Sequence, residues 1–232
     1  MDLITTKLGL EMLLRWGHFM AGITWIGLLY YFNFVQTEYF KEADATSKSD
    51  AIQKLVPKAL WWFRWGAMFT LVTGIGIFAV RGGGMSMDIY VGALLGLFMF
   101  LNVWLIIWPN QQIVMASAKQ VADGGDVLPE ATDALATAGL ASRTNTLFSI
   151  PMLFFMGASA HYPHSFSLLA FVLAVAAIVA LEFNGAYPAI KHIDVLKKLP
   201  EGGNMKPYAS VNGVIYCGLG LTIILFLILD LL

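Results

Sequence analysis

The stretch LGLEMLLRWGHFMAGITWIGLLYYFNFV, residues 8–35, is long and apolar enough to cross a lipid bilayer, which takes about 20 such residues. Its polar and small side chains recur every third or fourth residue, and this spacing places them on one face of a helix. That face carries Glu11, Arg15, His18, Gly22, Trp25, Leu29, Asn33 and Gln36. Because lipid offers such groups no partner, a polar stripe inside a span faces the bundle interior and indicates a functional path.

Further stretches of similar length and hydropathy predict an all-α fold, a polytopic transmembrane helix bundle of about six spans in a single domain over residues 1–232. The predicted spans are Leu8–Val35, Ala59–Val80, Tyr90–Trp108, Asn145–Ala160, Ser167–Tyr187 and Ala209–Leu231. The fourth is the most polar, and Pro151 within it is expected to kink the helix. Gly66, Thr70 and Gly74 recur every fourth residue and predict a close helix–helix contact.

Composition supports a membrane protein. Hydrophobic residues make up 58% of the chain and charged residues 12%, whereas soluble domains are about half apolar and about a quarter charged. A net charge of -1 argues against nucleic acid as a partner, because few phosphates could be neutralised. The single cysteine, Cys217, excludes an internal disulfide and a metal cage built on several thiolates.

Most of the fourteen Lys and Arg residues lie in three connections, those between the first and second, third and fourth, and fifth and sixth spans. Basic residues concentrate in cytoplasmic loops. We therefore expect these connections in the cytoplasm, and both termini in the periplasm, of a bacterial inner-membrane protein. The short connections Arg81–Asp88 and His161–Ser165 are then periplasmic, and the first span is expected to stay uncleaved.

His18 is the main candidate for chemistry. It lies about ten residues from the outer end of the first span and therefore roughly 15 Å deep, near the middle of the bilayer. Neutral imidazole is a common axial ligand of haem iron, and helical bundles hold haem between their helices. The alternative is a hydrogen-bonded histidine that stabilises helix packing. Trp25 shares the face of His18 and is expected to line a bound haem.

Two arginines have more than one interpretation. Arg15 can pair with Glu11, four residues earlier on the same face, or hold a haem propionate or an anionic substrate. Arg143 could attract the same anions, or could pair with Glu182, which is expected about one turn inside the bilayer. Glu182 is therefore either half of an ion pair with Arg143 or Arg64, or a proton relay.

A second axial ligand is less evident. Met152 and Met156 lie at a depth not far from that of His18, and a thioether can ligate haem iron, although methionine also fills gaps in cores. His161 and His164 flank a Tyr-Pro turn near the outer surface. They could ligate a separate metal ion there, or could simply lie in a hydrated turn.

Three segments together resemble a known family. They are Arg15-Trp16-Gly17-His18 through Gly27, Ile107-Trp108-Pro109-Asn110-Gln111, and Ser142-Arg143-Thr144-Asn145 through His161-Tyr162-Pro163. In this order they are similar to the membrane domain of the integral-membrane urate oxidase (urate hydroxylase, PuuD-type) family. The resemblance implies oxidation of urate to 5-hydroxyisourate, with electrons passed to a cytochrome c. Members carry a C-terminal cytochrome c domain, whereas this chain has no C-x-x-C-H, so a separate periplasmic cytochrome is the expected acceptor.

The leading hypothesis is a membrane oxidoreductase with a b-type haem on His18, an anionic purine attracted by Arg15 and Arg143, and His161 in contact with the electron partner or shuttling protons. An alternative is a non-catalytic membrane subunit of a respiratory or other complex. A third is a transporter whose path is the polar stripe. An absorption spectrum of the purified protein would distinguish the first hypothesis from the others.

Overall fold

The computed structural model describes residues 2–232, apart from the side chain of Lys197. Within these residues all regular structure is helical, as predicted. The helices are α1 (Asp2–Thr5), α2 (Lys7–Tyr30), α3 (Thr37–Glu42), α4 (Ala45–Lys54), α5 (Val56–Arg81), α6 (Met87–Leu101), α7 (Trp108–Ala122), α8 (Ala131–His161), α9 (Leu168–Ile190) and α10 (Val211–Leu231). A 3₁₀ turn, η3 (Leu196–Lys198), lies in the connection between α9 and α10.

Two long helical rods contain a wider π-helical segment. In the first, η1 (Tyr31–Gln36) joins α2 to α3, and in the second, η2 (Asn102–Ile107) joins α6 to α7. Pro109 lies two residues after the end of η2 and has no amide hydrogen to donate, so the segment with i→i+5 bonding before it accommodates the missing bond. The helix that contains the predicted third span continues beyond Trp108, through Pro109 to Ala122, and the end of the span within it stays a prediction.

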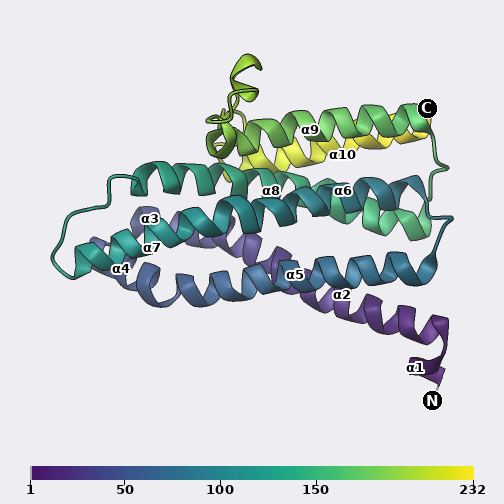
Figure 1. Cartoon of the computed structure of the whole chain (residues 1–232), viewed down its shortest axis with the longest axis horizontal. Coiled ribbons are helices and arrows are strands. Elements are labelled where there is room, and N and C mark those ends of the chain that lie inside the picture. The colour runs from purple at the N-terminus through teal and green to yellow at the C-terminus, as the bar shows by residue number, and fades with distance from the viewer. Residues whose placement is uncertain (1) are drawn as a thin grey trace.

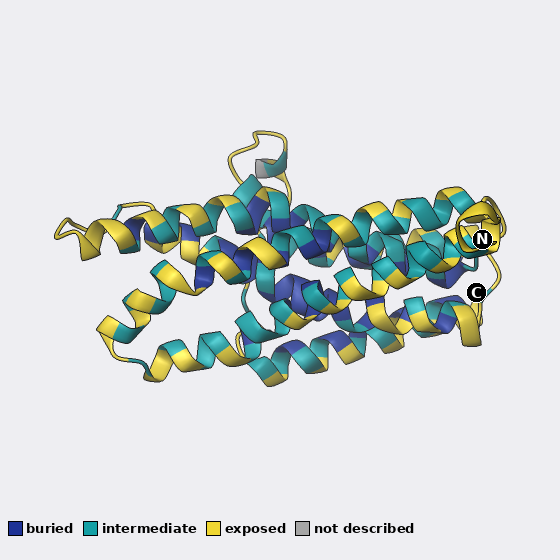
Figure 2. Cartoon of the chain, turned by 90° about the horizontal axis from the view of Figure 1, so that it is seen from below, coloured by how far each residue is buried: buried dark blue, intermediate teal, exposed yellow. Residues whose placement is uncertain are grey.

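Helix α8 is the centre of the bundle. It packs against α6, η2, α7, α9 and α10, whereas α2 packs mainly against α5 (Figure 1). Buried residues follow α8 along most of its length, and the buried positions of the neighbouring helices face the same interior (Figure 2). The Ala-rich stretch after Pro129 forms the first part of α8. Helix α8 also continues through Pro151 without interruption.

Four helical segments within residues 2–232 are long and apolar enough to span a bilayer: Val56–Arg81, Met87–Ala122, Leu168–Ile190 and Val211–Leu231. They contain, or overlap to within two residues, four of the predicted spans. Helices α2 and α8 coincide with the other two predicted spans but are more polar, since α2 carries the polar stripe and α8 buries Asn, Ser and Thr side chains. The arrangement of six spans therefore stays a prediction.

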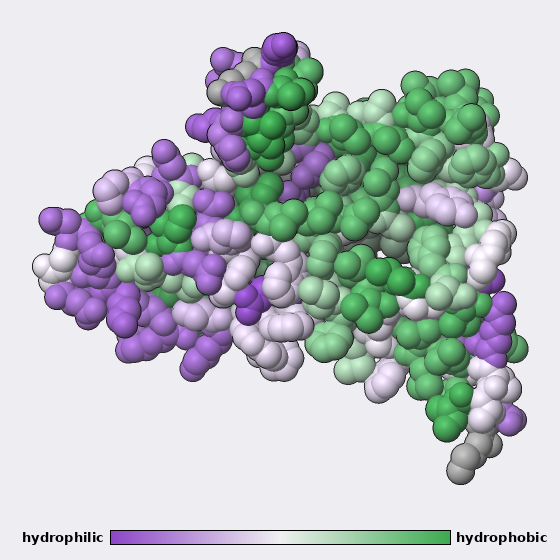
Figure 3. Space-filling view, viewed as in Figure 1, coloured by the Kyte–Doolittle hydropathy of each residue, from purple (hydrophilic) through white to green (hydrophobic). Residues whose placement is uncertain are grey.

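The two ends of the bundle differ in polarity. Both chain ends lie at one end, while α3, α4 and the end of α7 lie at the other (Figure 1). Hydrophilic side chains gather over α3, α4 and α7, and apolar ones cover most of the remaining visible face (Figure 3). This places two of the basic connections at the end opposite the termini, while the third, between α9 and α10, protrudes from the side of the bundle at the ends of those helices that lie away from the chain termini (Figure 1). The side of the membrane on which each end lies stays a prediction.

Candidate functional site

The imidazole of His18 lies in the contact between α2 and α5. Its Nδ1 is 3.1 Å from Thr73 Oγ1. On the other helix, a Cβ added at Gly74 would lie 3.3 Å from His18 Cε1, so the glycine makes room for the ring. The predicted close contact at Gly66, Thr70 and Gly74 is confirmed for both glycines, because a Cβ at Gly66 would approach the backbone of Ala21 and Trp25 to 3.2–3.3 Å.

The hydrogen bonds of Thr73 determine the tautomer of His18. Thr73 Oγ1 donates its single hydrogen to a main-chain carbonyl, with Phe69 O at 2.6 Å and Thr70 O at 3.1 Å. The hydroxyl oxygen therefore accepts from His18, and Nδ1 carries the imidazole hydrogen. In the neutral ring this leaves a lone pair on Nε2, for which the described residues provide no hydrogen bond. Such an outer partner is typical of a metal-ligating histidine.

The remaining polar groups of the first span have separate partners. Arg15 donates to Glu11 Oε1 from Nε at 2.9 Å and from Nη2 at 2.7 Å. Arg81 lies 3.5 Å from the same carboxylate oxygen. The ion-pair interpretation of Arg15 is thus present in the structure. Trp25 is buried, and its indole N–H has no hydrogen-bond acceptor among the described residues.

The two methionines offered as a second axial ligand occupy packing positions. Met152 belongs to the hydrophobic core. Met156 contacts α6, where a Cβ added at Gly92 would lie 3.3 Å from its Cγ. Within residues 2–232, no group of three or more His, Cys, Asp or Glu side chains is arranged to hold a metal ion. A ligand role for either methionine stays a prediction.

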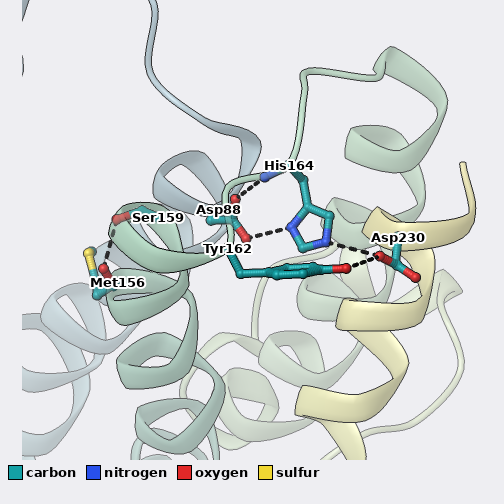
Figure 4. A network of polar contacts seen from close by, with 6 residues as sticks. All are labelled: Asp88, Met156, Ser159, Tyr162, His164 and Asp230. Atoms are coloured by element: carbon teal, nitrogen blue, oxygen red, sulfur yellow. Dashed lines mark hydrogen bonds and ion pairs between the residues drawn. The ribbon is translucent and has the colours of Figure 1, made fainter.

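His161 and His164 have different surroundings. His161 is exposed at the end of α8. The His164 side chain is 8% exposed, and its Nδ1 lies 2.8 Å from Asp88 Oδ1 on α6. On the other side of the ring, Nε2 lies 3.6 Å from Asp230 Oδ1 on α10, and Tyr162 donates to the same carboxylate (Figure 4).

The main chain reinforces this cluster of Asp88, Tyr162, His164 and Asp230. The His164 amide donates to Asp88 Oδ2 at 2.8 Å, and the Met87 amide donates to the His164 carbonyl at 3.0 Å. The turn between α8 and α9 is thereby joined to the start of α6 and the end of α10. His164 thus has a hydrogen-bonded carboxylate at Nδ1, whereas Nε2 lies near Asp230 without a hydrogen bond among the described residues. His161 is not among the residues of this cluster.

Glu182 accepts a hydrogen bond from Asn102 at 3.0 Å. The same Asn102 amide nitrogen donates to Asn145 Oδ1 at 2.9 Å, and Asn145 donates to the Met99 carbonyl at 2.9 Å. These contacts join α9, η2, α8 and α6 through buried polar groups. The described residues show no ion pair from Glu182 to Arg143 or Arg64, and Arg64 instead lies over Trp108 at 3.8 Å from the ring centroid.

A cavity of about 410 Å³ lies where the apolar part of the bundle meets its polar end. We call it the Arg143 cavity. Segments from η1, α3, α4, α5, η2, α7 and α8 line it, together with Met205. Arg143 is 7% exposed, and its Nη1 has no hydrogen-bond partner among the described residues. Gln36 also lines the cavity, and its Oε1 is buried and unpaired.

Some of these partners could not be found by sequence reasoning. Thr73 lies beside the Thr70–Gly74 spacing, but only the pairing of α2 with α5 places its hydroxyl on His18. In the sequence, Asp88 and Asp230 are single acids at the ends of apolar stretches, and nothing there connects either of them to His164. Asn102 was an isolated amide inside a predicted span, which is the one signal that could have identified it.

The architecture and these buried polar groups define a helical membrane protein with a ligand-competent histidine in its helix bundle. Residues 83–209 match the family described as Urate oxidase N-terminal. Since the match covers more than half of the chain, the protein belongs to this family. No curated protein and no solved structure matches the chain.

Proposed function

We propose that this protein is a membrane-bound oxidoreductase that oxidises urate or a related purine and passes electrons to a periplasmic cytochrome c. The observation that carries the proposal is the His18 ring, which Thr73 holds with Nε2 available. Membership of the urate oxidase N-terminal family supports the substrate class. The apolar helices support a lipid environment, for which we propose the bacterial inner membrane.

The orientation and hydrogen bonding of the His18 ring fit an axial ligand of a b-type haem. An axial histidine needs a free lone pair and a fixed ring orientation, and His18 has both. His18 would ligate the iron, and Thr73 would keep the ring in the required tautomer. The indole N–H of Trp25 is unpaired among the described residues and can donate a hydrogen bond to a group bound on the same face of the helix. The haem, when bound, would supply one-electron redox chemistry.

His161 is the residue that we propose to contact the electron partner. It is exposed at the end of α8, and this end of the bundle also carries the two chain termini in Figure 1. The loop charges assign the same end to the periplasm. A soluble cytochrome c could therefore reach His161 without crossing the membrane.

The absorption spectrum of protein purified in detergent tests the proposal. We expect a Soret band and a reducible α band, and we expect His18→Ala to lose them while the helical circular dichroism is retained. His161→Ala is the matched control and should keep the bands while slowing urate-dependent reduction of cytochrome c. A colourless protein, or full haem content in His18→Ala, would refute the assignment of His18.

A further inference from the structure

Two residues that line the Arg143 cavity each carry a buried polar atom that has no hydrogen-bond partner among the described residues. Arg143 Nη1 and Gln36 Oε1 are both inaccessible to solvent and lack hydrogen-bond partners within residues 2–232. An unpaired buried polar group is unfavourable, and more so if it is charged. Both residues line the same cavity, although neither unpaired atom is itself exposed in it. A ligand that enters the cavity could pair with both atoms once these two side chains turn toward it.

The charge of the cavity favours an anion. Arg143, Lys41 and Lys48 line it, and no Asp or Glu of the described chain does so. The acid whose charge acts on Arg143 is Glu38, but Glu38 accepts two hydrogen bonds of 2.8 Å from Lys41. The guanidinium is therefore not hydrogen-bonded to a carboxylate of the described protein. Arginine binds flat oxyanions in a bidentate manner.

The other walls favour a flat ring. Phe32, Phe40 and Phe63 line the cavity, and aromatic side chains pack well against planar groups. Asn33 and Gln111 add two more side-chain amides to the wall besides Gln36. A volume of about 410 Å³ lies within the usual range for small-molecule sites.

The cavity is separate from His18. Asn33, which lines the cavity, lies about 22 Å beyond His18 along the same helical rod, at 1.5 Å per residue. The lining residues come from the end of the bundle that holds α3 and α4, opposite the two chain ends (Figure 1). A ligand in the cavity would therefore not touch a group held by His18.

We infer that the Arg143 cavity is a binding site for a small planar organic anion that carries ring N–H groups, with Arg143 binding its oxyanion and Gln36 accepting from its N–H. The choice of a purine oxyanion as the ligand rests on the proposed function, whereas the anion site itself rests on the cavity alone. The site is reached from the end of the bundle that carries the basic connections.

Isothermal titration of the full-length protein in detergent with sodium urate tests this inference. We expect saturable binding, with hypoxanthine, an uncharged purine at neutral pH, bound at least about tenfold more weakly, because charge-assisted hydrogen bonds are roughly twice as strong as neutral ones. Sodium sulfate measures attraction to charge alone and should not compete at equal concentration.

Variants locate the site. Arg143→Gln removes the charge but keeps an amide donor, and we expect it to weaken urate binding about tenfold or more. Gln36→Leu should weaken urate binding by a smaller factor and leaves Arg143 in place, so the inference stays testable if Arg143→Gln does not fold. Lys58→Gln is the control, because it removes an exposed positive charge that does not line the cavity.

The inference is overturned if urate does not bind, if sulfate binds as tightly as urate, or if Arg143→Gln and Gln36→Leu both bind urate as the unaltered protein does. These outcomes are independent of the haem spectrum. Loss of haem in His18→Ala with unchanged urate affinity would separate the two sites, whereas urate binding by a colourless protein would leave the anion site standing without the proposed redox function.

Discussion

The hydroxyl of Thr73 is the smallest feature on which the proposed chemistry depends. It accepts from His18 Nδ1 because its own hydrogen is committed to a carbonyl of α5. A threonine thus decides which imidazole nitrogen is free. The hydroxyl of the neighbouring Thr70 bonds within its own helix, to Gly66 O at 2.7 Å. The two threonines form a natural pair for testing this role.

We predict that Thr73→Val lowers haem retention about 10- to 100-fold, the range typical for loss of an outer partner of a metal ligand. The measurement is the ratio of Soret absorbance to protein after dilution or competition with an apo-haem acceptor. Thr70→Val should retain haem as the unaltered protein does. Equal retention in both variants would contradict the role of Thr73.

The neighbours of Glu182 narrow its interpretation but leave the proton relay as a prediction. The sequence left an ion pair and a proton relay open, and the structure gives the carboxylate an amide partner, Asn102, in place of a cation. Asn102 Oδ1 is itself buried and unpaired among the described residues. A glutamine at position 182 could keep the existing bond and donate to this oxygen.

We therefore predict that Glu182→Gln leaves the thermal stability of the detergent-solubilised protein unchanged or slightly raised. Asn102→Ala should cost about 2 kcal/mol, because it leaves Glu182 and Asn145 without their donor. Thermal unfolding followed by circular dichroism compares the two variants. If Glu182→Gln is as destabilising as Asn102→Ala, the carboxylate has a charged partner that these contacts do not show. Loss of urate-dependent electron transfer in a stable Glu182→Gln protein would support a relay.

At the scale of elements, the connection between α8 and α9 is held by side chains from two other helices. Asp88 is fully buried at the start of α6, and His164 bridges it to Asp230 at the end of α10. Four helices therefore meet through one imidazole. The contact joins segments that are far apart in the chain, so it should be lost only when the bundle opens at this end.

We predict that His164→Ala lowers the free energy of unfolding by about 2 kcal/mol, because Asp88 keeps only its main-chain donor and Asp230 loses a partner. His161→Ala changes an exposed histidine three residues away and should have little effect. Chemical or thermal unfolding in the same detergent measures both. Similar stability losses in the two variants would show that the Asp88–His164 contact contributes little.

The helical rods show what local sequence misses about elements. The predicted third span ends at Trp108, beside Pro109. The π-helical bonding of η2 accommodates the missing amide hydrogen of Pro109, and α7 continues for about three more turns. The Ala-rich stretch after Pro129 likewise joins α8 because its alanines, including Ala131, Ala134 and Ala138, are buried against neighbouring segments. Tertiary burial, which hydropathy windows do not contain, therefore accompanies the first part of α8, whereas α7 buries only Ser117.

At the scale of the whole molecule, the bundle has one polar end and one end that carries both termini (Figures 1 and 3). The basic connections predict that the polar end is cytoplasmic. That orientation would place the Arg143 cavity on the cytoplasmic side and His161 on the periplasmic side. Binding of an anion and contact with an electron acceptor would then occur on opposite sides of the membrane.

Cysteine labelling of intact cells tests this orientation. In a Cys217→Ser background, we predict that a membrane-impermeant maleimide labels Gly83→Cys, in the turn between α5 and α6. Val127→Cys, in the exposed connection between α7 and α8, should be labelled only after lysis. The reverse pattern would invert the proposed orientation, and labelling of both sites in intact cells would show that the two connections share a side.

Much of this protein was readable from its sequence, because helix period and hydropathy are local properties. The helical class, the helices that contain the predicted spans, the polar stripe of α2, the Gly66–Gly74 contact and the family all followed from residues close together in the chain. The tertiary structure alone decided that Thr73 bonds His18, that Asp88 and Asp230 enclose His164, and that Arg143 is left unpaired in a cavity. These contacts depend on which helices pack side by side, and that pairing is set by the whole core rather than by any one segment.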